Sequence, residues 1–133
     1  MTEEILKFTK LTFIIHFVIL LLYAFLFWLP EFNTPLYGMT YTPELGALQL
    51  MLASCFTAFT IGALFGIFAK EWKQVRIVVI IDVFMNVTML IALALTFSVF
   101  NALIYVAFVV TILLIVLFCL TFLQQEDKIK TLY

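Results

Sequence analysis

The chain has 133 residues, of which 66% are hydrophobic and 11% are charged. A water-soluble domain carries about 25% charged residues, so this composition excludes an ordinary soluble fold. The formal net charge of −1 gives no reason to expect nucleic-acid binding. Four membrane spans of about 20 residues, with short connections, use the whole length, which predicts a single membrane domain over 1–133.

Four apolar stretches predict membrane-spanning helices over residues 8–29, 43–69, 75–97 and 102–123. The first stretch is too long for a signal-peptide core and has no small-residue cleavage pattern, so we expect it to be retained. We therefore predict an all-α fold, a four-helix transmembrane bundle with up-down-up-down topology.

The connections between these stretches differ in length and in the residues that mark helix ends. An outer loop over 30–42 joins the first two spans, which need not touch along their full length. Thr42, Pro43 and Glu44 give a clear helix start, since they supply a cap, a proline at the first helical position and an acidic first turn. The turn near 98–101 is tight, which predicts that spans three and four are antiparallel neighbours.

All basic residues fall on one side of the predicted membrane. They precede the first span, lie between the second and third, or follow the fourth: Lys7, Lys10, Lys70, Lys73, Arg76, Lys128 and Lys130. Basic residues are poorly translocated, so this bias predicts that both termini are cytoplasmic. The polar segment 124–133 is then a cytoplasmic tail, and we expect the membrane to be the plasma membrane.

Three polar residues inside the spans are candidate site residues: His16, Asp82 and Asn86. His16 lies six residues beyond Lys10 and Asp82 six beyond Arg76, so each is about 9 Å inward from its basic anchor. The two side chains meet at one level if the first and third helices pack together.

Ionisable residues in hydrocarbon are costly, which makes this pair a candidate proton-linked or polar-ligand site. The alternatives are interhelical hydrogen bonds, worth about 0.6 kcal/mol on average, or contact with a partner subunit. On the second span, Gln49 is expected to extend this polar interior.

Small residues recur at every fourth position of the second span, at Ser54, Ala58, Gly62 and Gly66. Small side chains allow two helix backbones to approach closely, so this ridge is a candidate helix-packing interface. The partner is either another subunit or another helix of the same bundle. The fourth span is almost free of polar residues and is expected to face lipid or an apolar partner.

Other motifs are mostly missing from the sequence. One histidine, with no Cys/His cluster, argues against a zinc site or a bis-histidine haem, and we expect no cofactor and no metal. No hydrolase, zinc-protease, P-loop or dinucleotide motif occurs, so no catalytic residues are assigned. Cys55 and Cys119 lie at different depths, which argues against a disulfide.

The layout resembles a broad group of uncharacterised small four-span membrane proteins. The shared features are Leu29-Pro30 at the end of the first span, Tyr37-Gly38 in the outer loop, a small-residue second span, and the segment Val79-Ile80-Ile81-Asp82. The chain departs from some such families because its second span has no arginine. The resemblance implies a membrane bundle and carries over no activity.

Taken together, these features favour a non-catalytic accessory or scaffolding subunit of a larger membrane complex, with lipids and other membrane subunits as partners. The first alternative is a small homo-oligomeric proton- or ion-linked channel or transporter that uses Asp82 and His16. A lower alternative is a membrane enzyme or a lipid-binding protein with a pocket between the polar faces of the first and third spans.

Overall fold

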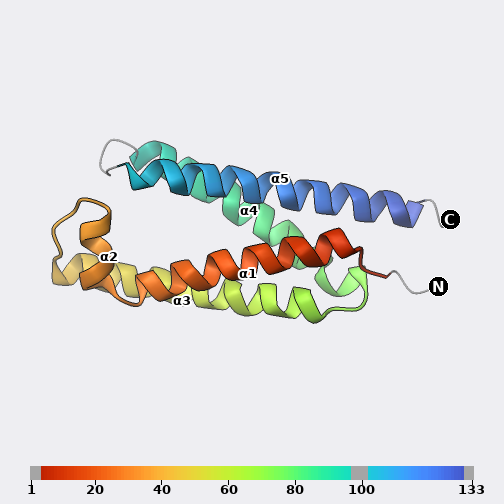
Figure 1. Cartoon of the computed structure of the whole chain (residues 1–133), viewed down its shortest axis with the longest axis horizontal. Helices are drawn as coiled ribbons and strands as arrows, with labels where there is room; N and C mark the ends of the chain where they lie inside the picture. The colour runs from red at the N-terminus through yellow and green to blue at the C-terminus, as the bar shows by residue number, and fades with distance from the viewer. Residues whose placement is uncertain (1–3, 97–101, 131–133) are drawn as a thin grey trace.

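The computed structural model describes residues 4–96 and 102–130, and these residues form an all-α bundle (Figure 1). The helices are α1 (Lys7–Phe27), α2 (Pro30–Leu36), α3 (Pro43–Phe68), α4 (Trp72–Thr96) and α5 (Leu103–Lys130). Four of them, α1, α3, α4 and α5, are long and apolar enough to cross a membrane. The protein is therefore membrane-embedded, and the predicted four-span helical bundle is confirmed.

The bundle consists of two helical hairpins that lie side by side (Figure 1). In the first hairpin, α1 packs against α3 from Phe13 beside Gly66 to Phe27 beside Phe56, so the two helices are antiparallel and in extensive contact. This contact is closer than the long connection between them leads one to expect. Its cause is the row of small residues on the buried face of α3, including Ala53 and Ala63, which lets the backbones approach.

In the second hairpin, α4 packs against α5, as the tight turn between them predicts. Contacts between the hairpins are sparser and run mainly from α1 to α5 and from α3 to α4. The predicted turn near 98–101 and the end of the third span lie outside the described residues.

Three segments differ from the predicted bounds. The outer connection contains the short helix α2, which begins at Pro30, a residue suited to the first turn of a helix. Helix α4 begins at Trp72 rather than 75. Helix α5 continues past residue 123 to Lys130, so much of the predicted tail is helical. Thr42 caps α3 as predicted, its hydroxyl accepting from the amide of Leu45 at 3.3 Å.

The helix ends that carry the basic residues are joined by polar contacts. The fully buried Gln125 of α5 accepts from the amide of Leu6 at 3.0 Å and donates to the carbonyl of Glu4 at 3.0 Å. Trp72, also buried, donates its indole N–H to Glu126 at 2.8 Å. The segment preceding α1 is thus held to α5, and the start of α4 is held to the same helix.

Candidate functional site

The predicted pair of ionisable residues is brought together between the two hairpins. His16 of α1 is 0% exposed and Asp82 of α4 is 2% exposed, and Nδ1 of His16 lies 3.5 Å from Oδ2 of Asp82. Neither of these atoms makes a hydrogen bond within the described part of the chain. The imidazole instead packs edge-on against the ring of Phe118 on α5, with centroids 4.8 Å apart. The two side chains are therefore buried where the hairpins meet.

Asn86, the third member of the predicted polar set, lies one helical turn above Asp82. Its side-chain amide donates to the backbone carbonyl of Asp82 at 2.8 Å. Asn86 is 3% exposed and forms part of the wall of a cavity, as does Leu20, one turn above His16. The lining begins at Ile19 and Met85, three residues beyond His16 and Asp82, so the ionisable pair lies about 4.5 Å below the floor of that cavity.

The polar residues on one face of α1, Thr9, Thr12 and His16, contact two different helices. His16 faces α4, but Thr12 accepts a hydrogen bond from Thr121 of α5 at 3.0 Å, and Thr9 donates to Gln125 at 3.3 Å. The fourth span is predicted to face lipid or an apolar partner, but its Thr121, and Gln125 beyond the predicted end of the span, bond to α1. They hold the two hairpins together.

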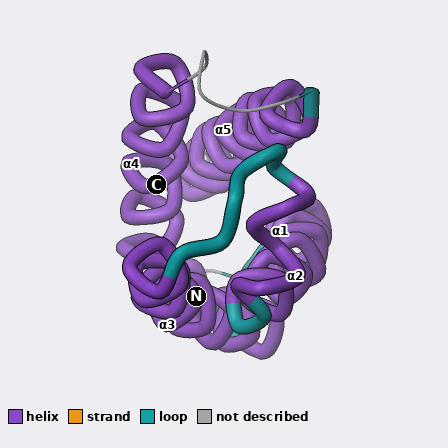
Figure 2. The backbone as a smooth tube through the Cα atoms, turned by 90° about the vertical axis from the view of Figure 1, so that its left-hand side faces the viewer, coloured by secondary structure: helices purple, strands orange, loops and turns teal. Residues whose placement is uncertain are grey.

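The cavity has a volume of about 340 Å³ and lies between the hairpins, toward the end opposite the basic residues. Every helix contributes to its walls, from Ile19 to Phe27 on α1 and from Met85 to Thr96 on α4. Figure 2 shows the loop between α2 and α3 running across this end of the bundle, and Tyr37 and Met39 from that connection are part of the wall. The cavity is mostly apolar.

A chain of polar side chains lies at the outer end of the cavity. Asn33 of α2 donates to Oε1 of Gln49 at 3.0 Å, and Gln49 donates to the hydroxyl of Thr34 at 2.8 Å. The Thr34 hydroxyl donates in turn to the carbonyl of Pro30 at 2.6 Å. All three side chains are almost fully buried. Gln49 is therefore part of a polar cluster, though one that is separate from His16 and Asp82.

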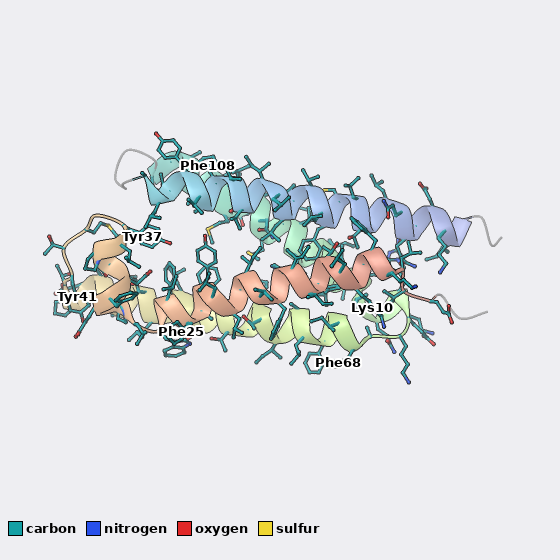
Figure 3. All side chains as sticks on the ribbon, viewed as in Figure 1. Lys10, Phe25, Tyr37, Tyr41, Phe68 and Phe108 are labelled. Atoms are coloured by element: carbon teal, nitrogen blue, oxygen red, sulfur yellow. The ribbon has the colours of Figure 1, made fainter. Side chains whose placement is uncertain are left out.

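Tyr37 completes this polar end. Figure 3 labels it at the end of the bundle away from Lys10. Burial, together with the neighbouring Tyr23, raises the pKa of Tyr37 to about 12, so its hydroxyl stays protonated near neutral pH. The cavity thus has a neutral polar end and an apolar body.

The four small residues of α3 do not act as one ridge. Gly66 is buried, and a Cβ there would meet the ring of Phe13, so this position serves packing within the chain. Ser54 and Ala58 are exposed, and a Cβ at Gly62 would have nothing within 4 Å. Ser54, Ala58 and Gly62 therefore face outward.

Comparison of the chain with protein-family models, with curated proteins and with solved structures found no match.

The sequence patterns do not single out Asn33 or Gln125. Asn33 lies in the predicted outer loop and Gln125 in the predicted cytoplasmic tail. A signal for Gln125 was present, since Phe118, Thr121 and Gln125 follow offsets of 0, 3 and 7 on one helix face. The position of Asn33 depends on how α2 folds back over α3, which no local pattern encodes.

Proposed function

We propose that this protein is a non-catalytic membrane protein that binds an apolar or amphiphilic molecule in the cavity between its two hairpins. The observation that carries the proposal is the cavity itself. It combines about 340 Å³ of mostly apolar space with a few polar groups gathered at one end. Small-molecule sites in proteins have this character: a concave, apolar pocket with few polar groups that fix orientation.

The size of the cavity bounds the occupant. A dry, apolar cavity of about 150 Å³ holds one benzene molecule, so 340 Å³ accommodates roughly 14 non-hydrogen atoms. This is a medium-length alkyl or terpenoid group, or part of a lipid chain. The surrounding membrane supplies such molecules at high local concentration.

A cavity-filling substitution tests this proposal. Ala92 and Ala94 of α4 are both exposed, but only Ala92 lines the cavity. A terminally fluorinated dodecane added to the protein in lipid nanodiscs should give a saturable protein-bound signal in fluorine NMR. Ala92→Phe should abolish the signal and Ala94→Phe should retain it, because only the first phenylalanine occupies ligand space. An unsaturable signal, or equal binding by both variants, would count against a specific site.

The sequence-based hypothesis of an accessory subunit is favoured by a different observation. Ser54, Ala58 and Gly62 form an outward stripe of small residues on α3, and no helix of the described chain covers it. A second membrane helix could approach closely there. Under this proposal, Gly62→Ile should release the protein from any complex that co-purifies with it, while Cys55→Ile, exposed on the same helix but off the stripe, should not.

We further propose that the basic end of the bundle faces the cytoplasm and that the membrane is the plasma membrane. The support is the location of the described basic residues at one end of the helices, among them Lys10, Lys70 and Lys128. The cavity then opens in the outer half of the bilayer, on the side that meets extracytoplasmic molecules first.

A further inference from the structure

The hydrogen bonds at the outer end of the cavity fix the orientation of two side-chain amides. Thr34 donates its only hydroxyl proton to the carbonyl of Pro30, so toward Gln49 it can only accept. Gln49 must therefore present its N–H₂ group to Thr34 and its Oε1 to Asn33. Asn33 then presents its N–H₂ group to Gln49, so Oδ1 of Asn33 lies at the end of this series of hydrogen bonds.

Oδ1 of Asn33 is a buried acceptor to which no described residue donates a hydrogen bond. Asn33 is 1% exposed, it lines the cavity, and its Oδ1 has no hydrogen-bond partner among the described residues. A buried polar atom without a partner is costly, and in native proteins such atoms are normally satisfied. The group that satisfies Oδ1 must carry a polar hydrogen.

The walls also restrict the charge of the occupant. Among the described residues that line the cavity, none is Asp, Glu, Lys, Arg or His. A carboxylate, phosphate or ammonium head group would lose its hydration without gaining an ionic partner, which is strongly unfavourable. An uncharged head group is therefore required.

From these observations, and resting on the proposed function, we propose that the cavity binds a neutral aliphatic alcohol whose hydroxyl donates a hydrogen bond to Oδ1 of Asn33. The alkyl part extends along the apolar body of the cavity toward Leu20 and Asn86. With roughly 14 non-hydrogen atoms accommodated, a saturated twelve-carbon alcohol serves as the probe.

Selectivity between two ligands of equal size is the measurable consequence. Dodecanol and methyl undecyl ether have the same number of non-hydrogen atoms, but only the alcohol can donate a hydrogen bond. A ligand that leaves a buried acceptor unpaired binds roughly tenfold more weakly than one that pairs it. The native protein should therefore prefer the alcohol by about tenfold.

The experiment is displacement of terminally fluorinated dodecanol by each competitor in lipid nanodiscs, followed by fluorine NMR. Asn33→Leu should reduce the preference for the alcohol to about one, chiefly by weakening alcohol binding. Phe32→Leu, an exposed residue of the same helix that does not line the cavity, should leave the preference at about tenfold. This pair of results supports the inference.

The possible failures are distinguishable. Saturable binding with no preference for the alcohol overturns the inference and leaves the proposed cavity function intact. A preference that survives Asn33→Leu but is lost in Asn86→Leu moves the polar contact to the other end of the cavity, and also overturns the assignment to Asn33. If the fluorinated alcohol shows no saturable bound signal at all, both the inference and the proposed function fail.

Discussion

The contact between Gly66 and Phe13 makes a quantitative prediction for the α1–α3 interface. A Cβ at Gly66 would lie 2.6 Å from Cγ of Phe13, well inside van der Waals contact. The Phe13 ring is 0% exposed and packs edge-on against Phe118 with centroids 5.7 Å apart, so it has little room to move. Adding a methyl group there must displace the ring or separate the two helices.

The expected magnitude follows from two opposing terms. Overpacking a tight interior costs about 1–3 kcal/mol, whereas alanine is favoured over glycine inside a helix by about 1 kcal/mol. Gly66→Ala should therefore lower the free energy of unfolding by up to about 2 kcal/mol. Gly62→Ala is the matched control, since no atom of the described residues lies within 4 Å of a Cβ at that position. It should leave stability unchanged or raise it by up to about 1 kcal/mol.

The assay is reversible unfolding in mixed micelles, followed by circular dichroism. If the clash is the cause, adding Phe13→Leu to Gly66→Ala should recover part of the loss, and a double-mutant cycle would measure the coupling. Equal stabilities for Gly66→Ala and Gly62→Ala, or no coupling between Gly66 and Phe13, would refute this account of the interface.

Two further predictions concern the polar contacts between helices. Asp82→Asn should change the free energy of unfolding by no more than about 0.6 kcal/mol, the average worth of an interhelical hydrogen bond, because no hydrogen bond joins Asp82 to His16 across their 3.5 Å separation. A proton-driven flux in liposomes that this substitution abolished would instead support the transport alternative. Gln125→Leu should lower the unfolding midpoint by more than Gln124→Leu in the same assay, because Gln125 is 0% exposed and satisfies backbone groups of Leu6 and Glu4. Equal effects at the two positions would show that the contacts of Gln125 contribute little.

Most of the fold follows from sequence patterns that act locally. Long apolar runs define the spans, Pro30 and Thr42 mark helix boundaries, and the depths of His16 and Asp82 relative to their basic anchors correctly predict that they lie at one level. These signals depend only on helix geometry and on the cost of burying polar groups in lipid.

The candidate site was harder to predict because it depends on how the hairpins are arranged. The cavity exists because two hairpins pack closely near His16 and less closely beyond Leu20, which no single helix encodes. The small residues of α3 illustrate the same limit. Their spacing predicts close helix contact but does not say which face meets α1, and the structure places Gly66 inward and Gly62 outward.

The buried Gln125 has a consequence for how the protein is made. Each hairpin is formed by neighbouring segments of the chain, so each can form soon after its second helix leaves the ribosome. The bonds from Gln125 to Leu6 and Glu4 join residues separated by 119 and 121 positions, and they require α5, the last of the described helices to be synthesised. The segment preceding α1 therefore cannot form these bonds until α5 has been synthesised. Its docking onto α5 requires that both hairpins are present and correctly aligned.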